Sequence, residues 1–152
     1  MTAQPQSKAE THVLQLTRQI KAAPAAVFAA LTEAEALATW FGPEGVSAKN
    51  VKVDLTLGGA YSLEMHHKDE LVTTLSGAYQ EISPPNRLVF TWIWGMGDMA
   101  GVETLVTIEL EENAEGCQLS LTHEGLPSAE SVEKHSFGWT GCFNCLESHL
   151  AA

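Results

Sequence analysis

Hydrophobic and polar residues alternate along much of the chain, with the period of two that is typical of β-strands with one buried face. The first such segment, residues 12–21, places Leu14, Leu16 and Ile20 on the same side of the strand. Turn-forming residues separate the later segments, as hairpins require. These segments are residues 46–68, which Gly58-Gly59 divides into two strands, and residues 71–82, 87–94, 103–112 and 117–125. We therefore predict about seven antiparallel strands.

Helical patterns interrupt the strands at two places, and the first follows the opening strand. Pro24 suits the first turn of a helix that places Val27, Phe28 and Leu31 on one face. A capping-box spacing follows this helix, because Thr32 precedes Glu35 by three residues. We expect that spacing to begin a second short helix. Its apolar residues are Leu37, Trp40 and Phe41.

The last part of the chain predicts one long helix that begins near Ser128 or Ser131 and ends at Leu150. At about 100° per residue its large apolar side chains fall on one stripe, and His135 lies beside that stripe. Such a stripe must be buried against another layer, and the sheet is the only large partner. The predicted fold class is therefore α+β, with a curved antiparallel sheet around a long C-terminal helix. The stripe consists of Val132, Trp139, Phe143, Leu146 and Leu150.

This order of elements and several local motifs resemble the SRPBCC superfamily, the helix-grip fold of START and Bet v 1-like domains. The matching motifs include "APAAVFAALTEAEALATWFGP", "GAYQEISPPNRLVFTW" and "GWTGCFNCLESHL". Within the superfamily the chain is similar to the bacterial branch related to the C-terminal domain of the heat-shock-protein ATPase activator. The resemblance covers about residues 14–150. It implies a cavity between the sheet and the long helix, and it leaves the activity open because this superfold serves many functions.

Length and composition fit one domain, because 152 residues that are 45% hydrophobic suffice for a single core. We expect residues 1–11 to form a disordered tail and residues 12–152 to form the domain. No window approaches the roughly 20 apolar residues of a membrane span. The polar N-terminus lacks the apolar stretch of a signal peptide, so we expect a cytoplasmic location.

The acidic balance of the chain narrows the classes of partner. A net charge of −11 repels phosphate backbones, so we expect no nucleic-acid partner, and we expect no membrane partner. Three cysteines do not suggest a disulfide framework. A chaperone partner ranks last among our expectations, because the separate N-terminal domain of the eukaryotic co-chaperone has no counterpart here. Formation of a homodimer is left open.

Aromatic residues make up 7% of the chain, yet they concentrate where the implied cavity would lie. Strand parity directs several of them, together with two histidines, toward the helix. Glycines and two methionines in "WGMGDMAG" suggest a mobile loop at the cavity mouth, since methionine adapts to varied ligands. The candidate ligand-binding residues are Trp40, Phe41, Tyr61, Met65, His67, Phe90, Trp92, Trp94, His123, His135, Trp139 and Phe143.

The histidines suggest an alternative chemistry. His123 ends a strand and His135 begins the long helix, so the loop between them brings the two imidazoles within reach of each other. Such a pair can act as acid and base near neutral pH. It can equally be a hydrogen-bonded structural pair at a strand–loop junction, and we favour that interpretation since no third group orients the pair.

A C-x2-C-x3-H string made by Cys142, Cys145 and His149 resembles a metal or redox motif. A tetrahedral zinc site needs a fourth, converging ligand, and the sequence places no second Cys or His pair to supply it. Reactive dithiols lie at helix N-termini, whereas this pair lies in the second half of its helix. We therefore predict a packing helix with no metal and no cofactor, and expect Trp139 and Phe143 rather than the thiols to touch a ligand.

Three functions remain after these exclusions. The first is the binding of a small hydrophobic or aromatic molecule in the cavity, which the inward aromatic residues favour. The second is an enzyme of cyclase, dehydratase or hydrolase type that uses the pocket histidines. The third is the co-chaperone role that the resemblance suggests. We rank them in that order.

Overall fold

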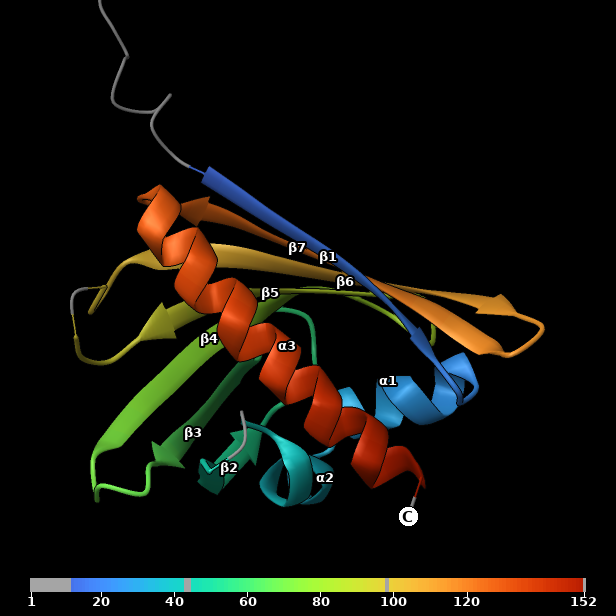
Figure 1. The fold of residues 1–152 in the computed structure, drawn as a ribbon, viewed down its shortest axis with the longest axis horizontal. Helices are drawn as coiled ribbons and strands as arrows, with labels where there is room; N and C mark the ends of the chain where they lie inside the picture. Colours follow the sequence, from blue (N-terminus) through green and yellow to red (C-terminus); the bar gives the residue numbers. More distant parts are fainter. Residues whose placement is uncertain (1–11, 43–44, 98, 152) are drawn as a thin grey trace, which may run out of the picture.

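A seven-stranded antiparallel sheet forms the body of the computed structural model, and one long helix crosses its face (Figure 1). The structure describes residues 12–42, 45–97 and 99–151. The expected tail over residues 1–11 lies outside the described residues. The strands follow the order β1-β7-β6-β5-β4-β3-β2, so every neighbouring pair except β1 and β7 is consecutive in the chain. The predicted α+β fold, a curved sheet around a C-terminal helix, is confirmed.

The strands form where the alternating pattern predicts them. Central strands β6 and β7 pair along most of their length, and their inward residues are almost fully buried. The strand bounds are β1 His12–Ile20, β2 Ser47–Val53, β3 Ala60–His66, β4 Val72–Ser83, β5 Arg87–Trp94, β6 Glu103–Asn113 and β7 Gly116–Leu126.

Two short helices, α1 (Pro24–Thr32) and α2 (Ala34–Trp40), follow β1 as predicted. The capping box expected between them is wrong. Thr32 lies in the last turn of α1, where its hydroxyl donates to the Phe28 carbonyl at 2.8 Å. Glu33 caps α2 instead, without a side-chain hydrogen bond. Because Thr32 is the last helical residue of α1, the boundary position before α2 belongs to Glu33.

The long helix α3 (Ala129–Ala151) begins at a serine pair in which each residue caps the other. The Ser131 backbone N–H donates to the Ser128 hydroxyl oxygen, and the Ser128 N–H donates to the Ser131 hydroxyl oxygen, both at 3.1 Å. This reciprocal arrangement satisfies donors that the first helical turn leaves free. Ser128 is therefore the cap, one of the two predicted starts.

The middle of α3 is buried against the sheet through Trp139, Phe143 and Leu146. Their partners are the inward residues of the central strands, of which Leu119 and Leu121 are almost inaccessible to solvent. This apolar layer is the single hydrophobic core of the described residues. Complete burial of one such side chain stabilises the fold by about 1.5–3 kcal/mol, so the core fixes α3 across the sheet.

One glycine lets two strands approach closely beside the core. A Cβ atom on Gly77 would lie 2.0 Å from the Thr91 carbonyl oxygen, a distance that no real side chain tolerates. That same carbonyl accepts the Tyr61 hydroxyl at 2.7 Å. Gly77 on β4 therefore leaves room for the Tyr61 ring of β3 to reach the Thr91 carbonyl on β5.

None of the helices in the described residues is long and apolar enough to cross a membrane.

Candidate ligand-binding cavity

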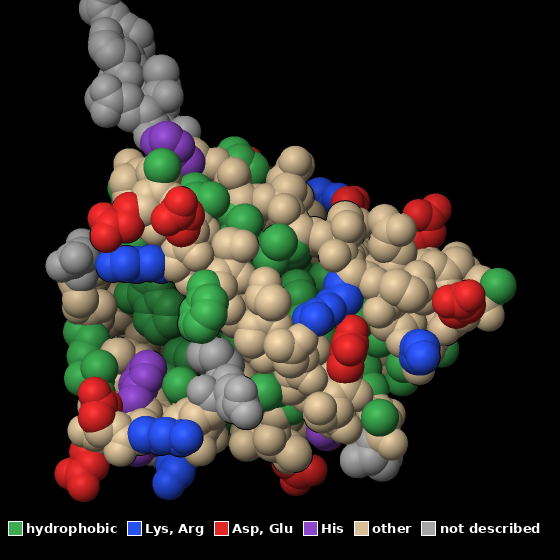
Figure 2. Space-filling view, in the orientation of Figure 1, with side chains coloured by type: hydrophobic (Ala, Val, Ile, Leu, Met, Phe, Trp, Pro, Cys, Tyr) green, Lys and Arg blue, Asp and Glu red, His purple; other side chains and the backbone are tan. Residues whose placement is uncertain are grey.

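A cavity of about 440 Å³ opens between the first half of α3 and strands β4 and β5. Figure 2 shows it as an apolar hollow on the left of the molecule, with charged side chains around its mouth. The end of β3, the loop between β5 and β6, and the residues before α3 complete the wall. The lining residues are His67, Thr73, Trp92, Trp94, Met96, Met99, Pro127, Ser128, Glu130, Ser131, Lys134, His135, Gly138, Trp139 and Cys142.

Three indole rings form the apolar wall. Trp92 is the central ring, with its centroid 4.9 Å from that of Trp139 and 5.5 Å from that of Trp94. Trp92 and Trp139 are buried, whereas Trp94 is half-buried at the end of β5. Aromatic pairs at these separations attract one another beyond the effect of area burial alone. The wall is therefore a continuous aromatic surface with one more exposed ring at its edge.

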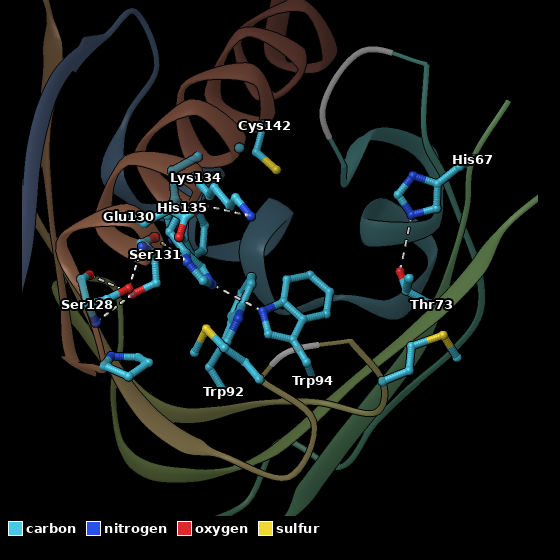
Figure 3. Close-up of a pocket in the computed structure, with 15 residues that line it drawn as sticks. His67, Thr73, Trp92, Trp94, Ser128, Glu130, Ser131, Lys134, His135 and Cys142 are labelled. Carbon is cyan, nitrogen blue, oxygen red and sulfur yellow. Dashed lines mark hydrogen bonds and ion pairs between the residues drawn. The ribbon is translucent and has the colours of Figure 1, made fainter. Parts of the chain in front are cut away.

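Charged and polar groups border the opening. Lys134 Nζ lies 3.6 Å from Glu130 Oε2, and both side chains are more than half exposed, so this ion pair contributes little to stability. On the opposite side His67 Nε2 and the Thr73 hydroxyl are 3.2 Å apart (Figure 3). The mouth is thus polar while the wall behind it is apolar, a common composition of ligand pockets.

His135 connects α3 to the aromatic wall. Its Nδ1–H donates to the Ser131 carbonyl at 2.7 Å, and its Nε2 accepts the Trp94 indole N–H at 3.1 Å (Figure 3). A carbonyl only accepts, so the proton belongs on Nδ1 and the lone pair on Nε2. Burial lowers the pKa of His135, although the bond to Ser131 opposes that effect. The imidazole is therefore neutral at pH 7.

His123 lies directly behind His135, with the ring centroids 5.0 Å apart. The Thr104 hydroxyl donates to the Trp92 carbonyl at 3.0 Å and accepts from His123 Nε2 at 2.8 Å. The Trp139 indole donates to His123 Nδ1 at 3.2 Å. Burial, with a smaller contribution from the charge of His135, lowers the pKa of His123 to about 3. His123 is a neutral structural residue with both ring nitrogens bonded.

Trp92 differs from the other two indoles of the wall in its polar atom. Its Nε1 is buried and has no hydrogen-bond partner among the described residues. Aromatic rings surround it, including Phe41 at 6.4 Å between centroids. The N–H groups of Trp94 and Trp139 each donate to a histidine, so of the three indoles only these two bond to the imidazoles.

Cys142 forms part of the cavity wall, contrary to our expectation that the thiols would lie away from a ligand. It is buried, and desolvation raises the pKa of its thiol to about 12. Such a thiol stays protonated and acts as a small apolar surface. Phe143, expected on the wall, lies instead in the core, 5.5 Å from Trp139. No group of three or more His, Cys, Asp or Glu residues that could hold a metal ion occurs within the described ranges.

A second, much smaller void of about 40 Å³ lies deeper in the molecule. Trp92 and Trp139 line both spaces, so these two rings form the partition between them. The other walls of the inner void are apolar or tyrosine side chains. They are Leu31, Leu37, Phe41, Tyr61, Leu63, Leu75, Tyr79, Leu88, Phe90 and Ile108.

The candidate residues from the sequence divide among three locations. The cavity wall contains His67, Trp92, Trp94, His135 and Trp139. The inner void contains Phe41, Tyr61 and Phe90 as well as the two shared tryptophans. Neither space is lined by Trp40, Met65, His123 or Phe143. Trp40 is fixed in the core by its indole N–H, which donates to the Ala30 carbonyl at 2.8 Å.

Sequence reasoning missed most of the wall that α3 contributes. Ser131, His135, Gly138 and Cys142 follow one another at spacings of four, three and four residues, which places them on one helical face. This face lies beside the large apolar stripe and consists of small or polar residues. A search for small residues next to the stripe would have found it, because short side chains leave space between a helix and the layer opposite it.

Residues 21–151 match the family described as activator of Hsp90 ATPase homolog 1-like protein. The chain belongs to this family. Membership confirms the resemblance to the heat-shock-protein ATPase activator branch that the motifs indicated. No curated protein matches the sequence of the chain.

Solved structures support the same assignment. A protein from Chromobacterium violaceum is 31% identical with a TM-score of 0.81, and the match covers 90% of this chain and 95% of that one. The AHSA1 protein from Silicibacter pomeroyi is 31% identical with a TM-score of 0.83 and coverages of 92% and 98%. DynU16, from the dynemicin biosynthetic locus, shares only the fold, at 20% identity, a TM-score of 0.74 and coverages of 92% and 47%.

Proposed function

We propose that the chain binds a small hydrophobic or aromatic molecule in the cavity beside α3. The observation that carries this proposal is the aromatic cavity itself, about 440 Å³ in volume and open to solvent. That volume falls in the range of small-molecule sites, about 300–1,000 Å³. Three indole faces supply apolar contact area, and the polar mouth favours entry of a molecule with one polar group.

The arrangement of the histidines favours binding over acid–base catalysis. Each imidazole has both nitrogens engaged, and the pKa of each lies below the ordinary histidine value. A general acid or base needs a free position and a pKa near the working pH. The enzymatic alternative therefore ranks second, and the partner role suggested by the family description ranks below it.

Gly138 offers a sharp test of the proposal. It faces the cavity from α3, and a Cβ atom added there meets nothing within 4 Å. Gly138→Leu should fill the space without disturbing the fold, whereas Gly138→Ala adds one methyl group and stabilises the helix by up to about 1 kcal/mol. Naphthalene-sized probes are titrated against all three proteins, with intrinsic fluorescence and native mass spectrometry as readouts.

We expect the wild type and Gly138→Ala to bind the probe saturably and one-to-one. Gly138→Leu should bind at least about tenfold more weakly, equivalent to about 1.4 kcal/mol of lost contact. Equal thermal unfolding temperatures for the two variants would show that the fold is intact. The proposal fails if a broad set of aromatic and aliphatic probes gives no saturable binding to the wild type, or if the leucine variant binds equally well.

A further inference from the structure

Most polar groups on the cavity wall bond to residues near them in sequence. Ser128 and Ser131 cap the first turn of α3, and Lys134 pairs with Glu130 one turn away. The His135 Nε2 lone pair is different, because its partner is a side chain from the opposite layer, the Trp94 indole. It is therefore the acceptor on the wall whose bond depends on the rotamer of a side chain from another layer.

The Trp94 side chain can leave this acceptor without movement of its backbone. Its carbonyl accepts the Gly101 N–H at 2.9 Å, and the following Gly95 N–H donates to the Thr74 carbonyl at 2.9 Å. The peptide bond that follows Trp94 is thus held by two hydrogen bonds. The ring is half-buried at the cavity edge and projects into the open space (Figure 3). Rotation of the side chain alone would expose His135 Nε2 to the cavity.

The Trp94 ring also shows what chemistry this acceptor takes. An indole is a planar aromatic group with a single N–H donor, and it reaches His135 Nε2 at 3.1 Å. A phenol or another aromatic ring with one hydroxyl or N–H offers the same combination. We propose that His135 Nε2 is the polar anchor of the cavity and binds an aromatic ligand through its hydroxyl or N–H, in place of the Trp94 indole. This inference rests on the proposed function and names its ligand class.

The charges around the anchor agree with a neutral donor. His123 behind it is neutral, and Lys134 and Glu130 at the rim oppose each other. Since Ser131 fixes the proton on Nδ1, an anionic carboxylate would meet the Nε2 lone pair with lone pairs of its own. A carboxylate should therefore bind less well than a hydroxyl at this position.

Two probes of similar shape test the anchor. 2-Naphthol carries a hydroxyl where 2-methylnaphthalene carries a methyl group. The ratio of their two Kd values measures the preference for the hydroxyl. A change in that ratio between wild type and variant reports the hydrogen bond from the ligand hydroxyl to His135 Nε2. Isothermal titration calorimetry is applied to the wild type, His135→Phe and Trp94→Phe. The first variant keeps a ring but removes the acceptor, and the second keeps a ring but removes the competing indole N–H. Circular dichroism checks that each variant is folded.

Relative to the wild type, His135→Phe should reduce the preference for 2-naphthol about twofold to tenfold, the effect of one net hydrogen bond. Trp94→Phe should increase the preference, since the acceptor no longer has to give up a partner. An unchanged preference in His135→Phe, or a reduced one in Trp94→Phe, would overturn the anchor. Tighter binding of 2-naphthoate than of 2-naphthol would move the anchor to Lys134 and also overturn it.

The outcomes separate this inference from the proposed function. If neither naphthalene derivative binds the wild type, the proposed function itself fails. If both bind and the ratio is the same in all three proteins, the cavity binds ligands and only the anchor is refuted. If His135→Phe does not fold, Trp94→Phe decides alone, because an increased preference supports the anchor and any other result refutes it.

Discussion

The outer cavity and the inner void share two tryptophan rings, yet one is open and the other is nearly filled. The difference follows from what faces each space. The inner void meets Leu31, Leu37 and Phe41 from the segment of α1 and α2, which fill the space under the sheet. The outer cavity meets the first half of α3, where Gly138 and Ser131 present little volume. The segment of the two short helices thus fills the inner space between sheet and α3, whereas the outer cavity stays open.

The polar atoms of the two spaces differ as well. The inner void has two tyrosines, and the Tyr61 hydroxyl is bonded to the Thr91 carbonyl. The outer cavity has histidines, serines and an ion pair at its mouth. A filled, mostly apolar space contributes to stability, whereas an open apolar space bordered by a few polar groups is suited to recognition. This contrast predicts different responses of the two regions to substitution and to pH.

The largest expected effect comes from truncating a side chain in the closed region. Phe90→Ala should lower the free energy of unfolding by about 3–5 kcal/mol, because this buried ring lines the inner void and the filled surroundings cannot collapse around the missing ring. Met96→Ala, at a cavity-lining residue that is 40% exposed, should change it by less than about 0.5 kcal/mol. Urea denaturation measures both, and similar losses would contradict the division into closed and open halves.

Acid should destabilise the protein through the histidine behind the outer wall. The folded-state pKa of His123 is about 3 and its unfolded value is 6.5, so below pH 6.5 the unfolded chain binds a proton that the folded chain does not. At pH 5 this difference removes about 2 kcal/mol, with a further loss in the same direction from His135. Denaturant midpoints between pH 7 and 5 test it. The share from His123 should disappear in His123→Gln while the smaller share from His135 remains; an identical pH slope in that variant would refute the assignment.

Alkali should act on the inner region instead. Burial raises the pKa of Tyr79 from 10.0 to about 12, so between these values the unfolded chain is ionised while the folded chain stays neutral. The free energy of unfolding should therefore fall as pH rises above 10, by about 1.4 kcal/mol at pH 11. Tyr61 contributes in the same direction. Tyr79→Phe, compared with the wild type at pH 9 and 11, should lose less stability; an equal loss would contradict this origin.

The sequence predicted the architecture well because period-two and helical patterns directly reflect which face is buried. It also placed Trp92, Trp94 and Trp139 near one another, since strand parity and helical spacing determine their direction. It did not distinguish Phe143 from Cys142, because both are buried and only the local width of the space separates a core residue from a wall residue. Nor did it predict that Thr32 bonds to its own helix, as a hydroxyl has two competing backbone partners.

The histidine pair illustrates a second limit. The predicted topology was enough to expect that His123 and His135 approach each other. It did not predict which side chains form hydrogen bonds with them. Trp94, Thr104 and Trp139 come from three different elements, and side-chain pairing between distant elements leaves no period in the sequence. Together with burial, these partners keep the imidazoles neutral, which is why we place ligand binding ahead of acid–base catalysis in the proposed function.

The partition made by Trp92 and Trp139 has a consequence for ligand length. The two rings, 4.9 Å apart, form a wall one side chain thick between the cavity and the void. A smaller residue at either position would join the two spaces end to end. On the proposed function, such a substitution should lengthen the molecule that the cavity binds, at a cost in stability because both rings are buried.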